Sequence, residues 1–237
     1  MSELTGQVAI VTGAARGIGE AIARRLAAMG ATVILTARDT AQLDRVKLEI
    51  QVKGGIAETA HLDLLDEPSI ARVAKMVENR YHRCDILVNN AGIGMMGKPL
   101  HETSLTEWDA LIGTNLCGPY LMVRAFAPTM ISARSGHIIN ISSLAGRNPL
   151  PNGAAYSASK WGLNGLTYSL AEELRQYNIR VSVVAPGSVN TQFGGGMRSN
   201  PDKRIQPDDV AHVIAMLVTQ APQSFVSEVL LRPTQKP

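Results

Sequence analysis

The sequence predicts one α/β domain built on a doubly wound parallel sheet of about seven strands, with helices on both faces. Short β-branched runs alternate with amphipathic segments along the chain, and this alternation favours right-handed crossovers between parallel strands. The 237 residues are 45% hydrophobic, and no Pro- or Ser-rich linker divides them. We therefore expect a single domain over residues 1–237.

The first strand, Gln7 to Thr12, runs into glycines at 13, 17 and 19 and then into a helix that stops at Gly30. Glycines at these positions let the backbone turn sharply and approach a pyrophosphate, whose charge then meets the helix N-terminus. A tight packing turn is the alternative interpretation.

The other elements follow at regular intervals. Strands are expected at 31–37, 56–62, 85–92, 137–141, 179–184 and 225–231. Helices are expected from 40 to about 53, over 67–81, from 106 to about 131, from the Tyr156 region to about 177, and from 207 to about 219. Asn115 falls in the middle of a helix, where its propensity is poor, so it is either a surface residue or retained for a function.

Tyr156 and Lys160 stand four residues apart in a helical segment, which places both heads on one face. A phenol must lose about 3 pKa units to act as an acid or base near neutral pH, and a lysine charge about 4 Å away supplies energy of that order. Ser143 lies thirteen residues upstream at the end of a strand, where α/β sheets place their chemistry. Alone, such a pair also occurs on solvated helix faces.

Composition argues against several other classes of protein. The net charge is +3 without a dense basic block, and 4% of residues are aromatic, so a nucleic-acid surface is not expected. Short, interrupted apolar runs and an N-terminus without a leader pattern predict a soluble cytoplasmic protein without membrane attachment. Cys84 and Cys117 show no metal-ligand spacing, so two reduced, partly buried thiols and no metal are expected.

Residues 192–206 are glycine-rich and charged, and they directly follow a strand. They are predicted to form a mobile substrate lid, with a disordered surface loop as a nearly equal alternative. Met95, Met96 and Met197 are expected to contribute an adaptable apolar wall for substrate, unless they only fill gaps near the surface. An acidic carrier protein could contact Arg134, Arg198, Lys203 and Arg204, which are otherwise solvated surface charges.

Several motifs together resemble the short-chain dehydrogenase/reductase family over essentially the whole chain. They are Thr12 to Gly19, Asn89 to Gly92, Asn115, Ser143, Tyr156 with Lys160, and Pro186-Gly187. The resemblance includes NADP-dependent 3-oxoacyl-[acyl-carrier-protein] reductases and implies a Rossmann fold. The last strand lacks the glycine pair that closes many relatives, which leaves the C-terminal packing and the choice between homodimer and homotetramer open.

The resemblance also implies roles for individual residues. Tyr156 would protonate a substrate carbonyl, Ser143 would hydrogen-bond it, with Ser142 as the fallback, and Lys160 would lower the phenol pKa and hold the ribose. Asn115 would position a water that relays protons. The cofactor would further contact Gly13, Arg16, Gly17, Ile18, Gly19, Ala37, Arg38, Asp63 at the adenine amine, Asn89 near the ribose, Ala91, Gly92, Pro186, Gly187, Val189 and Thr191.

The end of the second strand predicts NADP(H) as the cofactor. An NAD-selective site usually carries an acidic residue at the strand tip, where this chain has the small, uncharged Ala37. Arg38 and Arg16 offer donors for a 2′-phosphate. Asp39 lies too late to be the acidic selector and is interpreted as the N-cap of the next helix.

These expectations favour a reductase of a ketone or 3-oxoacyl thioester, with a small-molecule substrate that is free or bound to a carrier protein. A secondary-alcohol dehydrogenase would use the same residues in the opposite direction. A catalytically silent nucleotide-binding protein is the alternative from another class, and the complete set of Asn115, Ser143, Tyr156 and Lys160 argues against it.

Overall fold

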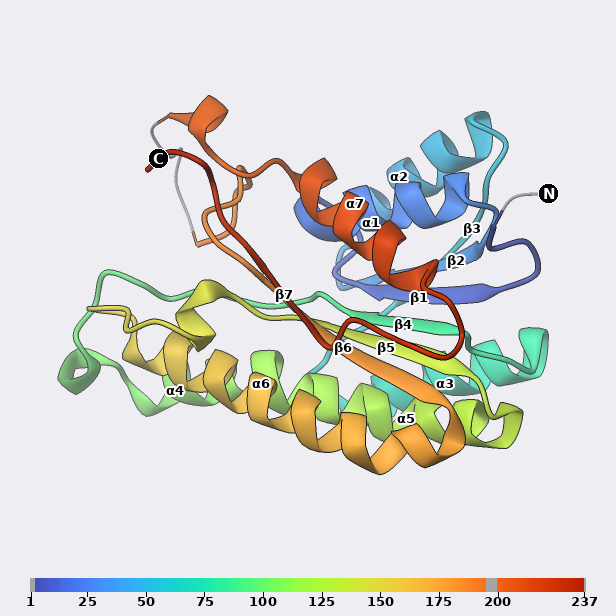
Figure 1. Ribbon diagram of the computed structural model, residues 1–237. Coiled ribbons are helices and arrows are strands. Elements are labelled where there is room, and N and C mark those ends of the chain that lie inside the picture. Colours follow the sequence, from blue (N-terminus) through green and yellow to red (C-terminus); the bar gives the residue numbers. More distant parts are fainter. Residues whose placement is uncertain (1–2, 195–199, 237) are drawn as a thin grey trace.

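The computed structural model describes residues 3–194 and 200–236. Within this part of the chain, seven strands form one parallel sheet in the order β3-β2-β1-β4-β5-β6-β7 (Figure 1). The strands are β1 Val8–Thr12, β2 Thr32–Ala37, β3 Ile56–His61, β4 Ile86–Asn89, β5 Gly136–Ile141, β6 Ile179–Pro186 and β7 Glu228–Leu231. The predicted doubly wound α/β sheet is confirmed.

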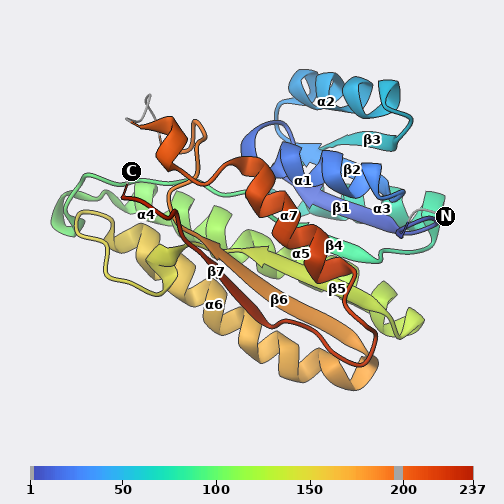
Figure 2. The ribbon, with the colours of Figure 1, turned by 45° about the horizontal axis from the view of Figure 1, so that its top comes forward.

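Helices cover both faces of the sheet. They are α1 Gly17–Ala28, α2 Thr40–Val52, α3 Glu67–Tyr81, α4 Leu105–Ile112, α5 Gly118–Ala133, α6 Ala154–Leu174 and α7 Pro207–Val218. One apolar core joins α1, α2 and α7 to the sheet, and a second joins α3, α5 and α6 to its opposite face. Figures 1 and 2 show the two layers on either side of the strands.

The strand order reverses between β1 and β4, where successive crossovers leave the sheet on opposite faces. A crevice forms outside the carboxyl ends of the strands at such a switch point, because neighbouring loops diverge there. The loops that follow β1, β4, β5 and β6 all line one cleft of about 1050 Å³. The topology therefore brings the sequence motifs to one edge of the sheet.

The segment 106–131, expected to be one α-helix, is divided in the structure. A π-helical turn, Gly113–Cys117, separates α4 from α5. Helical periodicity in the sequence does not distinguish this turn from regular helix, since it inserts only one residue into the repeat. The turn contains Asn115, which is fully buried and so is not a surface residue.

Candidate active site

The loop after β1 requires glycine at several points. Gly13 and Gly17 have φ of 66° and 59°, values that side-chain-bearing residues rarely adopt. A Cβ on Gly13 would lie 2.9 Å from the Cα of Ala91, and one on Gly19 would lie 2.2 Å from the carbonyl oxygen of Gly13. Gly19 therefore serves the packing of the turn, whereas Gly13 and Gly17 line the cleft.

The same loop is tied to the end of β4. The Thr12 hydroxyl oxygen accepts hydrogen bonds from the backbone N–H groups of Asn90 and Ala91, each at 2.9 Å. The Asn90 side chain donates to the carbonyl oxygen of Thr12 at 2.8 Å. These bonds fix the opening of the cleft before any ligand arrives.

Asn89, expected near a ribose, does not line the cleft. Its side chain is buried and donates to Asn140 on the neighbouring strand β5 at 2.9 Å. Successive residues of a strand point to opposite sides, and the side that faces a ligand is set by the tertiary fold. Asn90 is the asparagine of this pair that lies at the cleft.

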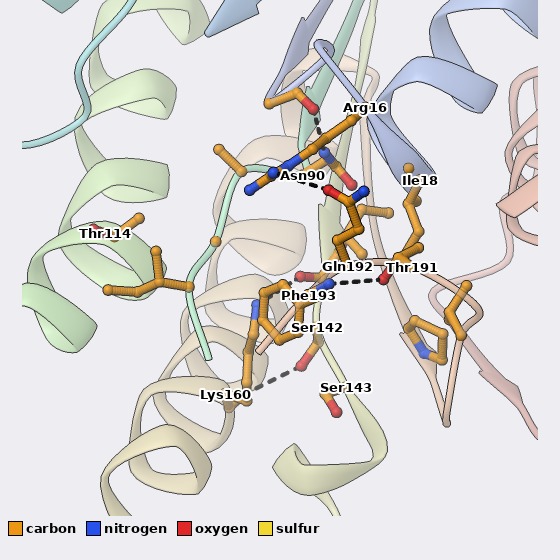
Figure 3. Close-up of a pocket in the computed structure, with 18 of the residues that line it drawn as sticks. Arg16, Ile18, Asn90, Thr114, Ser142, Ser143, Lys160, Thr191, Gln192 and Phe193 are labelled. Carbon is orange, nitrogen blue, oxygen red and sulfur yellow. Dashed lines mark hydrogen bonds between the residues drawn. The ribbon is translucent and has the colours of Figure 1, made fainter. Parts of the chain in front are cut away.

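The adenosine end of the expected cofactor site carries positive charge beside a small residue. Arg16, Ala37 and Arg38 all line the cleft. Asp39 caps α2, with its carboxylate accepting from the backbone N–H of Gln42 at 3.1 Å, so the cap interpretation is confirmed. Arg16 lies in the glycine loop and donates to the side chain of Gln192, in the segment that follows β6, at 3.3 Å (Figure 3).

Arg45 is a lining residue that the sequence analysis missed. It pairs with Glu20 and Glu49 at 2.8 and 2.9 Å, and it donates to the carbonyl oxygen of Ala15 in the glycine loop at 3.2 Å. Hydrogen bonds to Glu20 and Glu49 raise the pKa of Arg45. No local pattern in the sequence marks Arg45, because its contact with the glycine loop joins residues 30 positions apart.

Tyr156 and Lys160 occupy the first turns of α6. Tyr156 is 6% and Lys160 4% exposed. The Lys160 ammonium donates to the carbonyl oxygen of Ile141 at 2.9 Å and lies 5.9 Å from the centre of the Tyr156 ring. Burial lowers the pKa of Lys160 to about 8, because desolvation disfavours its charged form.

The two serines after β5 differ in their contacts. The Ser142 hydroxyl donates to the backbone carbonyl oxygen of Lys160 at 3.4 Å and is almost fully buried. The Ser143 oxygen accepts from the backbone N–H of Ala145 at 3.1 Å, which leaves its hydroxyl hydrogen to be donated into the cleft. Ser143 is thus better placed than Ser142 to bond a ligand oxygen (Figure 3).

The side-chain amide of Asn115 connects the π-helical turn between α4 and α5 to the loop that follows β4. Its oxygen accepts from the backbone N–H of Ile93 at 2.9 Å, and its nitrogen donates to the Ile93 carbonyl at 2.9 Å and to Ser159 at 3.1 Å. A Cβ on Gly92 would lie 3.1 Å from that amide oxygen and 3.7 Å from the Lys160 ammonium. Asn115 and Lys160 therefore border the same small space, and the π-helical turn places the amide there.

Most of the remaining expected cofactor contacts line the cleft. They are Ile18, Asp63, Ala91, Gly92, Pro186, Gly187, Val189 and Thr191.

The structure describes two of the three methionines that were expected to form an apolar wall for substrate. Met95 packs with Trp108 and Leu150 in an apolar cluster beside Tyr156. Met96, its neighbour, is the methionine that lines the cleft. Met197 and the central part of the expected lid, residues 195–199, lie outside the described residues. Leu144 and Leu150 were not expected and also line the cleft, as does Phe193 from the start of the expected lid segment.

The last strand contacts the site from the edge of the sheet. The backbone N–H of Gly187 donates to the carbonyl oxygen of Leu231 at 2.8 Å. Arg147, in the segment that follows Ser143, makes two hydrogen bonds of 2.8 and 2.6 Å to the Glu228 carboxylate. The Tyr168 hydroxyl lies 3.1 Å from the same carboxylate. The strand thus packs in parallel on β6 without the glycine pair of many relatives.

Two further observations concern the expected absences. Among residues 3–194 and 200–236, no group of three or more His, Cys, Asp or Glu side chains is arranged to hold a metal ion. Over the same residues, no helix combines the length and apolarity needed to cross a membrane. Both cysteines are free thiols as expected, but Cys117 is exposed rather than partly buried, whereas Cys84 is buried.

Comparison with known proteins agrees with the geometry. The family model described as short chain dehydrogenase matches residues 7–202. The chain belongs to the short-chain dehydrogenase/reductase family and is an oxidoreductase of that family. It is 35% identical, over 98% of its length and 100% of the relative, to an uncharacterised oxidoreductase of Staphylococcus saprophyticus. It is 36% identical to a 3-oxoacyl-[acyl-carrier-protein] reductase of Synechocystis, covering 96% of this chain and 95% of that one.

Solved structures of the family are also similar. A metagenomic short-chain oxidoreductase in complex with NADP shares 58% identity and a TM-score of 0.89, with 99% of this chain and 100% of the other covered. An alcohol dehydrogenase from the archaeon Thermococcus sibiricus, complexed with 5-hydroxy-NADP, shares 32% identity and a TM-score of 0.91, with 98% of both chains covered.

Proposed function

We propose that the protein is an NADPH-dependent carbonyl reductase whose substrate is a ketone or a 3-oxoacyl thioester. One observation carries this proposal: Tyr156, Ser143 and Lys160 converge in a cleft that also holds Arg16 and Arg38 beside the uncharged Ala37. The first group suits proton transfer to a carbonyl oxygen. The second suits a phosphorylated ribose.

The residues of the cleft fit NADP(H). The glycine loop lets backbone N–H groups approach a pyrophosphate at the N-terminus of α1, since Gly13 and Gly17 hold conformations closed to other residues. Arg16 and Arg38 provide two charge-assisted donors for a 2′-phosphate. The capping bond of Asp39 explains why an acidic residue is present near the strand tip without selecting NAD. Similar proteins bound to NADP and 5-hydroxy-NADP support this choice.

The chain's own residues would donate the proton and stabilise the charge that develops during the reaction. When bound, NADPH supplies a hydride to the carbonyl carbon. The Tyr156 hydroxyl donates its proton to the carbonyl oxygen, which becomes the alcohol. The Ser143 hydroxyl hydrogen-bonds that oxygen as negative charge develops on it. The Lys160 ammonium stabilises the phenolate that remains. Asn115, whose side chain is held by Ile93 and Ser159, would position a water from which the proton is replaced.

Oxidation of a secondary alcohol is the second candidate. The same residues perform it in reverse, with phenolate Tyr156 as the base, and a structurally similar protein is an alcohol dehydrogenase. The relatedness to a 3-oxoacyl-[acyl-carrier-protein] reductase supports the reductive direction and includes thioesters among the substrates.

A panel of ketones and acyl thioesters, assayed with NADPH and with NADH, tests the proposal. We expect consumption of NADPH with at least one carbonyl compound, and an efficiency with NADH lower by about 100-fold or more, the scale of two charge-assisted contacts. Efficient oxidation of alcohols without measurable reduction of any ketone would favour the second candidate. Cofactor binding without turnover in either direction would favour a silent nucleotide-binding protein.

We also propose that the protein assembles as a homodimer or homotetramer and that it is cytoplasmic. Leu105, Tyr120 and Trp161 are exposed on α4, α5 and α6, which lie together on one face of the sheet (Figure 2). Exposed apolar side chains on adjacent helices suit an interface between copies. The expected lid, residues 192–206, likewise stays a prediction.

A further inference from the structure

The two arginines proposed for the 2′-phosphate belong to different segments. Arg16 lies in the glycine loop immediately before α1, and Arg38 follows β2 and precedes the Asp39 cap of α2. Both side chains line the cleft. Two donors that serve one phosphate must keep a fixed relation to each other, because a donor that has to be ordered on binding contributes less affinity. Contacts that join the glycine loop to α2 therefore bear on the choice of cofactor.

The glycine loop is held from two sides just before Arg16. The backbone N–H of Ala14 donates to the carbonyl oxygen of Thr36 on β2 at 3.1 Å. The carbonyl oxygen of the next residue, Ala15, accepts a hydrogen bond of 3.2 Å from the guanidinium of Arg45 on α2. That carbonyl belongs to the peptide that joins Ala15 to Arg16. Arg45 thus fixes the plane of the peptide from which Arg16 begins.

Two carboxylates hold Arg45 in this position. Its guanidinium makes a fork of hydrogen bonds to the Glu20 carboxylate on α1, at 2.8 and 3.1 Å, and one of 2.9 Å to Glu49 on α2. Arg24, on α1, pairs with the same two carboxylates. These four side chains form the α1–α2 network, and Figure 2 shows the two helices side by side. A planar fork bonded in this way is preorganised.

The two arginines of the α1–α2 network differ in one respect. Arg45 lines the cleft and bonds the glycine loop, whereas Arg24 bonds the carboxylates and is not a lining residue. Each carries one positive charge beside the same partners. The contact with Ala15 therefore distinguishes what Arg45 does from what a second positive charge in the network does.

From these contacts we infer that Arg45 is a positioning residue for NADPH, which fixes Arg16 relative to Arg38 by holding the glycine loop against α2. The inference rests on the proposed function, since it names a residue that supports cofactor selection at the same site. Arg45 acts through the loop and is assigned no bond to phosphate. Its loss would let Arg16 move, which weakens the binding of NADPH more than that of NADH, because only NADPH carries the 2′-phosphate.

Arg45→Met and Arg24→Met are matched variants that test the inference. Each removes one positive charge from the α1–α2 network, but only the first removes the bond to Ala15. The dissociation constants of NADPH and NADH are measured without substrate. We expect Arg45→Met to weaken NADPH by a factor of about 10 and NADH by less than about threefold. Arg24→Met should leave the ratio of the two constants within about threefold of wild type.

Hydrogen–deuterium exchange of the cofactor-free protein reports on the loop itself. Amide hydrogens of residues 13–19 should exchange about threefold faster or more in Arg45→Met than in wild type, because the loop loses a bond that restrains it. Arg24→Met keeps this bond and should exchange at the wild-type rate. Faster exchange confined to Arg45→Met, together with a loss of affinity confined to NADPH, supports the inference.

The other outcomes separate the role of Arg45 from the proposed function. A ratio of dissociation constants that is unchanged in Arg45→Met, or lowered equally in Arg24→Met, overturns the inference and leaves the NADPH-dependent reductase intact. A lowered ratio with unchanged exchange shows that Arg45 bonds the phosphate directly, which also overturns it. Equal affinity of wild type for both cofactors refutes the proposed cofactor preference and the inference with it. If wild type prefers NADPH but reduces no carbonyl compound, the reductase proposal fails, and the binding constants still decide the role of Arg45.

Discussion

The ammonium of Lys160 lies one helical turn beyond Tyr156, 5.9 Å from the centre of its ring, and is held by the carbonyl oxygen of Ile141 at 2.9 Å. The charge is therefore fixed by the backbone of β5 rather than by a carboxylate. Its burial lowers the pKa of Lys160 to about 8, so at neutral pH the protein retains a charge at a cost in stability.

Lys160→Met should raise stability while abolishing turnover. Methionine removes the desolvated charge, and the loss of one hydrogen bond to Ile141 offsets part of the gain, leaving about 2 kcal/mol at pH 7. The unfolded lysine holds its proton to about pH 10.5 and the folded one to about pH 8, so wild-type stability rises with pH across that window. Chemical denaturation at pH 7 and pH 10 should show the advantage of the variant shrinking. A variant less stable than wild type at pH 7 would contradict the account.

Glu228→Gln should weaken the contact between the last strand and the segment that follows Ser143. The Arg147–Glu228 pair is about two-thirds buried and doubly hydrogen-bonded, so we expect a loss of about 1–2 kcal/mol. We also expect kcat to fall severalfold with the KM for NADPH unchanged, because Ser143 is the residue proposed to hydrogen-bond the substrate. Glu67→Gln, in the exposed pair with Arg124, is the matched control and should cost under about 0.5 kcal/mol. Equal effects of the two substitutions would refute the role of Glu228.

His137 should make the protein sensitive to acid. Its Nε2 donates to the Ser182 oxygen at 2.8 Å, since the Ser182 hydroxyl is itself donated to the carbonyl oxygen of Val226, and its Nδ1 has no partner among the described residues. Burial, with the nearby charge of Arg180, lowers the pKa of His137 to about 3. The unfolded state binds the proton first, so stability is lost as pH falls from about 6.5 toward 3, by up to about 1.4 kcal/mol per pH unit.

His137→Gln keeps a donor toward Ser182 and does not titrate. The variant should lose less stability than wild type between pH 7 and pH 4, as measured by chemical denaturation. Parallel pH profiles for the two proteins would show that His137 does not account for acid lability.

The sequence predicted the elements best where their signals are local. Helix α3 has the bounds expected from its periodicity and from Pro68 in its first turn, and the Asp39 cap was readable because it contacts a residue three positions away. The glycine loop was readable for the same reason. The π-helical turn at Asn115 was missed, because one inserted residue leaves the apolar pattern nearly unchanged.

The parts of the site that could not be predicted depend on contacts between distant segments. Asn89 and Asn90 are equivalent in sequence, and only the pairing of β4 with β1 and β5 decides which one faces the cleft. Met95 and Met96 are likewise neighbours in a loop, and the sequence does not show which of the two side chains faces the cleft. Phe193 meets Gly94 across about 100 residues of chain, and Arg147 meets Glu228 across 81, without a local pattern to link them.

Ala37→Asp should reverse the cofactor preference. A carboxylate at the end of β2 would repel a 2′-phosphate and accept bonds from a free ribose, so the ratio of efficiencies should move toward NADH. Arg38→Ala should remove a factor of about 10 from the preference for NADPH. Arg72→Ala, at an exposed arginine outside the cleft, is the control for loss of charge and should leave the ratio unchanged. Comparable efficiency of wild type with both cofactors would refute the assignment.

The most direct test of the proposed chemistry is the turnover of Tyr156→Phe with NADPH and a ketone that wild type reduces, measured beside the dissociation constant for NADPH. Phenylalanine preserves the packing against Phe193 and removes only the hydroxyl. We predict that kcat falls by a factor of about 100 or more, the scale of a lost general acid, while the dissociation constant changes less than about threefold. Turnover within tenfold of wild type, or an equal loss of cofactor binding, would contradict the assignment of Tyr156 as the proton donor.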